Sequence, residues 1–277
     1  MAESWVLPAF SGWVGQTWPA EVRPPRAVVG LVHGLGEHSG RYPQLVAALN
    51  AAGFAVTAVD LPGHGRSAGK RGHIPDYEQA LDALVAFAAF SRQQFDGQPF
   101  FFYGHSLGGN LVANVVLRRD VAGLQGAVIS SPWLRLAFEP PAYKVWLART
   151  VGRWLPGLLQ PNGLDPADLS RDPAVGEAYA RDPLVHDRIS AALFLSAYEA
   201  GLWALTHAGQ LRVPVLLMHG TADRLTSPEA SREFCRRAGE PCTLRLWEGF
   251  YHEVHHEIGR DAVYRAVLDW LNERLEG

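Results

Sequence analysis

Short runs of apolar residues recur along the chain, and several of them are apolar at every position rather than at alternate ones. They predict strands at residues 27–32, 55–59, 100–103, 127–129, 215–218 and 244–247. A strand that is apolar on both faces is typical of a parallel sheet covered on both sides by helices. Helical segments lie between these runs, so the alternation predicts an α/β fold with a mostly parallel central sheet.

Start and stop signals place four helices on this pattern. They are expected at residues 43–52, 77–94, 228–237 and 260–275. Asp76, three positions before Gln79, is the predicted cap of the second helix, and Ser227 followed by Pro228 opens the third. Residues 5–18 are expected to add an antiparallel strand at the edge of the sheet.

One region breaks the alternation of strands and helices. Residues 132–205 are rich in proline and aromatic side chains and contain no convincing strand, so we expect a helical cap inserted between two halves of the sheet. Its apolar stretch 189–205 is interrupted by Ser196 and Glu199, which makes it too short and too polar to span a membrane and predicts a buried helix. The whole chain, residues 1–277, is expected to form one domain with this cap.

Length and composition limit the classes of function. A chain of 277 residues can bury a substantial core. A net charge of −3, without a long run of like charges, gives no reason to expect a nucleic-acid partner. The first residues lack the basic start and apolar core of a signal peptide, so a cytoplasmic location is expected. Cys235 and Cys242 are then expected to be reduced core residues rather than a disulfide.

The segment Gly104-His105-Ser106-Leu107-Gly108 lies between the apolar run 100–103 and the apolar stretch 111–117. A serine with glycines two positions before and after it, between a strand and a helix, has the form of a nucleophile elbow. The turn strains the serine backbone, and side chains at the glycine positions would collide with the strand and the helix. Such a turn pushes the Oγ of Ser106 out above the sheet, where a base can reach it.

A serine nucleophile needs a base to take its proton and an acid to orient that base, in the chain order Ser, Asp, His for this kind of turn. Asp223 and His252 follow the fifth and sixth predicted strands. Because the carboxyl ends of parallel strands share one edge of a sheet, both would meet Ser106 there. Asp60, which also follows a strand, is the rival acid, and we expect it to tie its own loop together.

The backbone N–H groups of Leu35 and Leu107 are the candidates for an oxyanion hole. Leu107 follows Ser106 and begins the next helix, and Leu35 lies in the glycine-rich segment 33–38 after an early strand. A glycine-rich loop lets the backbone approach a substrate closely. Because the two leucines act through the main chain, their side chains are free to vary.

His252 also belongs to a second motif, because residues 252–256 match the zinc-binding pattern HExxH. Zinc would require a helix that carries His252 and His256 on one face, with Glu276 as the place to seek a third ligand. The segment follows a strand, which favours a loop, and Glu276 is the penultimate residue. We therefore expect no metal site, and we place His255 and His256 at the surface or behind the catalytic residues.

Five segments carry a resemblance to a known family. They are residues 33–42 (HGLGEHSGRY), 60–67 (DLPGHGRS), 104–109 (GHSLGG), 130–132 (SSP) and 219–223 (HGTAD). Together they resemble the monoacylglycerol lipase and lysophospholipase branch of the α/β-hydrolases, from about residue 18 to the C-terminus. The resemblance implies a serine esterase that acts on monoacylglycerols or similar monoacyl lipids, with Ser106, Asp223 and His252 as its triad.

Other activities stay open beside this one. Carboxylesterases, thioesterases and aminopeptidases share parts of the same motifs, and a zinc metallopeptidase or a fold that only binds ligand are more distant alternatives. The expected partner is a small acyl ester, and the reaction needs no metal or organic cofactor. Nothing in the residues selects an oligomeric state.

A candidate helix of the cap carries an apolar stripe at helical spacing. Its members are Tyr143, Trp146, Leu147, Val151, Trp154 and Leu155, while Lys144, Arg149 and Arg153 lie largely off it. One interpretation is a lid whose apolar face lines an acyl-chain tunnel and whose basic residues touch a lipid interface transiently. The other is a helix packed on the core with a solvated basic face. The candidates for contact with substrate are Trp133, Tyr143, Trp146 and Trp154.

Overall fold

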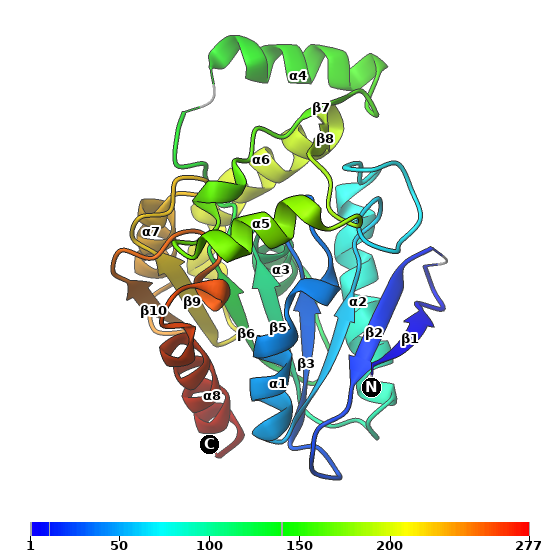
Figure 1. The fold of residues 1–277 in the computed structure, drawn as a ribbon, viewed down its shortest axis with the longest axis vertical. Coiled ribbons are helices and arrows are strands. Elements are labelled where there is room, and N and C mark those ends of the chain that lie inside the picture. The colour runs from blue at the N-terminus through cyan, green and yellow to red at the C-terminus, as the bar shows by residue number, and fades with distance from the viewer. Residues whose placement is uncertain (1, 11, 140, 277) are drawn as a thin grey trace.

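The computed structural model describes residues 2–10, 12–139 and 141–276, and its central feature is one sheet with helices on both faces (Figure 1). The described residues form eight strands in this sheet, in the order β1-β2-β4-β3-β5-β6-β9-β10. The strands are β1 (Glu3–Val6), β2 (Val14–Trp18), β3 (Ala27–Val32), β4 (Phe54–Val59), β5 (Phe100–His105), β6 (Leu124–Ser130), β9 (Val215–Gly220) and β10 (Cys242–Trp247). β2 pairs antiparallel with β1 and β4, and the pairs from β4 to β10 are parallel. The expected mostly parallel sheet is confirmed.

Helices cover this sheet in two layers. One layer holds α1 (Pro43–Ala51) and α8 (Arg260–Glu276), and the other holds α2 (Tyr77–Gln93), α3 (Leu107–Arg118), α6 (Ala191–His207) and α7 (Pro228–Ala238). In β3, Val29 packs with the first layer and its neighbour Val28 packs with the second. Both faces of the central strands are buried in this way, which explains why their sequences are apolar at successive positions.

The caps predicted from the sequence are present. Oδ1 of Asp76 accepts a hydrogen bond from the N–H of Gln79 at 3.0 Å, and Oγ of Ser227 accepts one from the N–H of Ala230 at 3.2 Å. Each of the four predicted helices differs from the observed one by a single residue at its C-terminal end. The N-terminal segment supplies the antiparallel strands β1 and β2, as expected.

The region predicted as a cap differs from the prediction in one respect, because it contains two strands. Its elements are α4 (Ala142–Trp154), β7 (Leu159–Pro161), α5 (Pro173–Arg181), β8 (Arg188–Ser190) and most of α6. β7 and β8 form a small antiparallel pair apart from the main sheet, and strands of three residues are too short to show an alternating pattern. α6 packs on α3 as a buried helix, whereas α4 stands at the far end of the molecule (Figure 1). The division into one domain with a cap stays a prediction.

Two expectations about the cellular setting have different outcomes. The expectation of reduced cysteines is wrong, because Cys235 and Cys242 form a disulfide with their Cα atoms 5.1 Å apart. The tight turn from α7 into β10 brings the two side chains together, which their spacing alone did not reveal. In the part of the chain that the structure describes, no helix has both the length and the hydrophobicity needed to cross a bilayer. The cytoplasmic location stays a prediction.

Candidate active site

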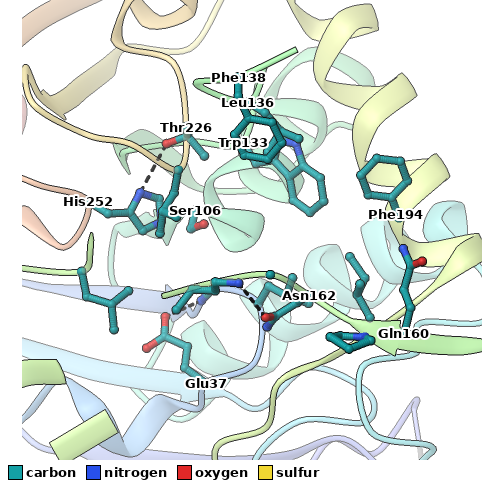
Figure 2. A pocket seen from close by; sticks show the side chains of 18 of the residues that line it. Glu37, Ser106, Trp133, Leu136, Phe138, Gln160, Asn162, Phe194, Thr226 and His252 are labelled. Atoms are coloured by element: carbon teal, nitrogen blue, oxygen red, sulfur yellow. Dashed lines mark hydrogen bonds between the residues drawn. The ribbon is translucent and has the colours of Figure 1, made fainter. Parts of the chain in front are cut away.

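The predicted turn at Ser106 has a strained backbone. Ser106 joins β5 to α3 with φ 53° and ψ −112°, in a region that side chains other than glycine rarely adopt. A Cβ built on Gly104 would lie 2.6 Å from the carbonyl oxygen of Gly108, and one built on Gly108 would overlap the carbonyl oxygen of Val32. Both glycines are therefore required for the strand and the helix to meet at this turn, which leaves the Ser106 side chain at the cavity wall (Figure 2).

Asp223 and His252 lie together at the same edge of the sheet. Oδ2 of Asp223 is 2.7 Å from Nδ1 of His252, and both side chains are buried. Oδ1 of Asp223 accepts hydrogen bonds from the N–H groups of Leu225 and Thr226 at 2.8 and 3.1 Å. His252 and Ser106 line the same cavity, where Figure 2 shows them close to each other. The structure therefore brings together three side chains that are far apart in the sequence.

Burial and mutual charge set the protonation of this pair. Burial would raise the pKa of Asp223, but His252 and a second histidine, His219, hold it below its ordinary value. Burial would lower the pKa of His252, but the carboxylate of Asp223 reverses the effect and the pKa is raised. An ionised Asp223 keeps a proton on Nδ1 of His252 and leaves Nε2 free to accept one.

Asp60, the rival acid, is engaged elsewhere. Its Oδ1 accepts a hydrogen bond from the N–H of Ser39 at 2.8 Å, and its Oδ2 accepts one from the N–H of Arg66 at 2.9 Å. The bond from Arg66 ties the loop after β4 to itself, as expected, and the bond from Ser39 also joins it to the loop after β3.

The loop that carries Leu35 lies against the serine. A Cβ built on Gly34 would come within 3.1 Å of the Cβ of Ser106. Oε1 of Glu37 accepts a hydrogen bond from the N–H of Gly34 at 2.6 Å and so holds the path of this loop. Leu107 is the first residue of α3, whose leading N–H groups have no acceptor within the helix. Both predicted oxyanion donors therefore border the same serine.

A buried ion network lies behind this loop, and sequence reasoning missed it. Nη1 of Arg41 is 2.7 Å from Oε2 of Glu37 and 2.6 Å from Oε1 of Glu253. Its Nη2 is 2.9 Å from Oε2 of Glu253. Oε2 of Glu253 is also 2.6 Å from Nδ1 of His256. Burial would raise the pKa of both glutamates, but Arg41 reverses this and holds both below their ordinary value. The available signal was the four-residue spacing of Glu37 and Arg41 in a loop predicted to border the site.

A cavity of about 480 Å³ opens over Ser106 and His252. This volume lies in the range of small-molecule sites, about 300 to 1,000 Å³. Most of the wall is apolar, with Trp133, Leu136, Phe138 and Phe194 among its members (Figure 2). Gln160 and Asn162, from β7 and the residue after it, add polar groups on the opposite wall (Figure 2). The cavity therefore suits a substrate with a large apolar part and a smaller polar one.

Comparison with known proteins identifies the family. A family model described as serine aminopeptidase S33 matches residues 23–259. The chain belongs to this family of α/β-hydrolases. The expected family is thereby confirmed, and the chain is a serine ester hydrolase.

Three similar proteins show how far the likeness extends. A monoacylglycerol lipase of Mycolicibacterium smegmatis is 34% identical over 253 residues, which are 91% of this chain and 90% of that protein. An uncharacterised abhydrolase domain-containing protein of Dictyostelium discoideum is 35% identical over 94% of this chain, but the chain spans 28% of its length. The crystal structure of a monoacylglycerol lipase from Paleococcus ferrophilus has a TM-score of 0.86 at 40% identity, covering 94% of this chain and 98% of the other.

The four residues that were candidates for substrate contact lie in different places in this serine hydrolase. Trp133 and Tyr143 line the cavity. Trp146 and Trp154 are not among the described residues of its wall, and their side chains are 65% and 82% exposed. The side chains of Lys144, Leu147, Val151 and Arg153 lie outside the described residues. The described aromatic residues of α4 are thus exposed and not packed on the core.

The HExxH segment of the hydrolase does not have the arrangement of a zinc site. Val254–His256 form a short 3-10 turn and not a helix with two histidines on one face. Nδ1 of His252 faces Asp223, whereas Nδ1 of His256 faces Glu253. Of the two positions expected for His255 and His256, the surface is wrong, because both side chains are buried.

Among the described residues, two groups of side chains bring potential metal ligands within 4.8 Å of one another. They are Glu37, His105 and Glu253, and Glu253, His255 and His256. Both groups include Glu253, whose carboxylate is already neutralised by the buried guanidinium of Arg41. A metal ion in either group would have to displace that guanidinium or share the Glu253 carboxylate with it, which like charges disfavour.

Proposed function

We propose that this hydrolase cleaves monoacylglycerols or similar monoacyl lipids through an acyl-enzyme on Ser106. Nε2 of His252 takes the proton of Ser106 as Oγ attacks the ester carbonyl, and Asp223 stabilises the imidazolium. The N–H groups of Leu35 and Leu107 hold the oxyanion. The alcohol leaves with the proton from His252, and water then attacks the acyl-enzyme by the same sequence, releasing the fatty acid.

The polarity of the cavity carries the choice of substrate. Among the described residues, Nδ2 of Asn162 and the hydroxyl of Tyr179 are buried without a hydrogen-bond partner. Both border the loop that carries Leu35, here called the oxyanion loop. A Cβ built on Gly36 in this loop would lie 2.8 Å from the Tyr179 hydroxyl and 3.4 Å from Nδ2 of Asn162. Figure 2 shows Asn162 across the cavity from the apolar Trp133 and Leu136. An alcohol with free hydroxyls would satisfy the polar atoms, while an acyl chain would cover the apolar wall.

The relatives support the same substrate class, because two of the three compared proteins are monoacylglycerol lipases. The family name raises aminopeptidase activity as the second candidate. An aminopeptidase would need a free carboxylate for the substrate ammonium group. Glu37 and Glu253 line the cavity, but Arg41 pairs with both. We therefore favour the ester.

A substrate panel tests this proposal. We expect wild-type kcat/KM to be higher for a 1-monoacylglycerol than for the methyl ester of the same acid, and negligible for aminoacyl amides. Tyr179→Phe removes one hydroxyl that has no described partner, and the loss of a neutral hydrogen bond should lower the ratio of the two ester rates about 3- to 10-fold. Tyr251→Phe, outside the described cavity wall, should keep the wild-type ratio. A panel led by amides, or by the methyl ester, would refute the assignment.

We also propose that residues 132–205 act as a cap whose α4 end meets a lipid surface. Exposed large apolar side chains gather on and beside α4: Phe138, Tyr143, Trp146, Trp154, Leu155 and Leu158. Apolar patches of this kind on a chain that handles lipid suit the boundary between headgroups and acyl chains. The helix stands clear of the sheet at one end of the molecule (Figure 1).

Trp154→Ser should weaken binding to phosphatidylcholine vesicles about 5- to 10-fold, because the most exposed of these side chains no longer enters the interface. Co-sedimentation with vesicles measures the effect, and turnover of a water-soluble short-chain ester should be unchanged. Val22→Ser is the matched control, since Val22 is an exposed apolar residue distant in sequence from the cap. Equal binding by both variants would refute lipid contact through α4.

A further inference from the structure

The carboxylate of Asp223 faces two histidines and not one. Nε2 of His219 lies 3.0 Å from the same Oδ2 that lies 2.7 Å from Nδ1 of His252. His219 belongs to β9, four residues before the acid, and its side chain is completely buried. The reaction proposed above uses His252 alone, so the second imidazole needs its own explanation.

The hydrogen bonds of His219 define how it meets the carboxylate. Its Nδ1 lies 2.7 Å from Oγ of Ser231 on α7. Because Nε2 faces a carboxylate oxygen, it carries the proton and donates, and Nδ1 then accepts from the Ser231 hydroxyl. Oγ1 of Thr226 is 2.9 Å from Oδ2 and 3.1 Å from the carbonyl oxygen of Ser131, so its single proton can serve either acceptor. Oδ2 thus faces two imidazole rings. His252 exchanges a proton with substrate, and His219 does not.

We propose that His219 is a positioning residue: its Nε2–H holds the Asp223 carboxylate and, by sharing the charge of Oδ2, limits how basic His252 becomes. This inference rests on the triad of the proposed function. A carboxylate oxygen with two imidazole donors attracts a proton on either ring less strongly than an oxygen with one. Without His219, the charge of Oδ2 would act on His252 alone, and His252 would stay protonated to a higher pH.

Several other charged or titratable groups face His252. Asp223 contacts it from the loop after β9, His219 of β9 shares the same carboxylate oxygen, and His105 of β5 lies 4.8 Å away between ring centroids. Glu253 and Glu37 act on it from its own loop and from the oxyanion loop. A substitution at position 219 leaves the side chains of the other groups in place, so a change in the titration of His252 can be assigned to the donor that Asp223 has lost.

The test is the pH profile of kcat/KM for a soluble short-chain ester. The acid limb reports the protonation of the free enzyme's base. In His219→Phe we expect this limb to move up by about 0.5 to 1 pH unit, because a hydrogen bond to an ionised group is lost. Turnover should then be about 3- to 10-fold below wild type at pH values on the limb and recover on the alkaline plateau. In His219→Gln, whose amide N–H can reach Oδ2, the limb should return toward its wild-type position.

A merely structural role predicts a different result. Loss of packing would lower turnover equally at every pH and leave the acid limb in place, and that outcome in an active His219→Phe would overturn the proposal. If that variant fails to fold, Ser231→Ala decides, because it keeps His219 and removes the hydroxyl that holds Nδ1. A smaller upward shift is then expected, and an unmoved limb would refute the inference. Titration of active sites with a phosphonate distinguishes the two proposals. If Ser106 is labelled but the acid limb does not move, the triad stands and only the positioning role of His219 is rejected.

Discussion

Ser106→Ala should lower the turnover of a monoacylglycerol by about a millionfold, because no other group can form the acyl-enzyme. The residual rate would come from the oxyanion donors and from binding, which act without the nucleophile. Release of fatty acid under single-turnover conditions measures the loss directly. KM should change little, since the substitution removes one hydroxyl at a wall that stays otherwise intact.

Ser131→Ala is the matched control for this experiment. Ser131 follows β6 at the same edge of the sheet, and its buried hydroxyl has no partner among the described residues. We expect its turnover to stay within about twofold of wild type, as for a substitution that removes no interaction. An active-site phosphonate should label wild type and Ser131→Ala but not Ser106→Ala. Substantial activity in Ser106→Ala would reject the acyl-enzyme, and labelling at another serine would move the nucleophile.

Local patterns were enough to predict the sheet and the elbow. The run 100–103 and the glycines around Ser106 are requirements that act over a few residues. In the structure Ser106 has a positive φ, and the two glycine positions have no room for a side chain. The positions of Asp223 and His252 could also be predicted, because parallel strands leave their carboxyl ends at one edge. Order along the chain thus translated into proximity in space.

Other features depend on contacts between distant segments, which no local pattern encodes. Glu253 neutralises Arg41 across more than two hundred residues of chain, and His219 meets Asp223 only because the loop after β9 folds back on its own strand. The disulfide of Cys235 and Cys242 depends on a turn whose tightness the spacing does not reveal. Whether α4 is packed or exposed could not be predicted for a related reason, since a helix packed on the core and an exposed lid carry the same apolar stripe.

Arg41→Met should destabilise the protein by about 3 to 5 kcal/mol, because it leaves the carboxylates of Glu37 and Glu253 buried without their cation. The side chains of the three residues are 7%, 3% and 2% exposed, so water cannot replace the lost partner. The guanidinium also lies over the ring of Tyr179 on α5, 4.7 Å from its centroid. This contact between Arg41 and α5 would be lost as well. Denaturant unfolding measures the change as a shift in midpoint at constant slope.

The pH dependence of this loss separates buried charge from lost packing. In wild type the pKa of both glutamates is lowered, so their contribution is present above about pH 4.5 and disappears as pH falls through the folded values. In Arg41→Met, the largest of the charges that oppose burial is lost and both pKa values rise, so the variant takes up protons and its deficit should shrink between pH 8 and about pH 5. Adding Glu37→Gln and Glu253→Gln should restore more than half of the loss at pH 8, whereas Arg181→Met, which breaks an exposed pair with Glu177, should cost less than about 1 kcal/mol. A deficit that is independent of pH would show that Arg41 stabilises the fold by packing and not by neutralising the two carboxylates.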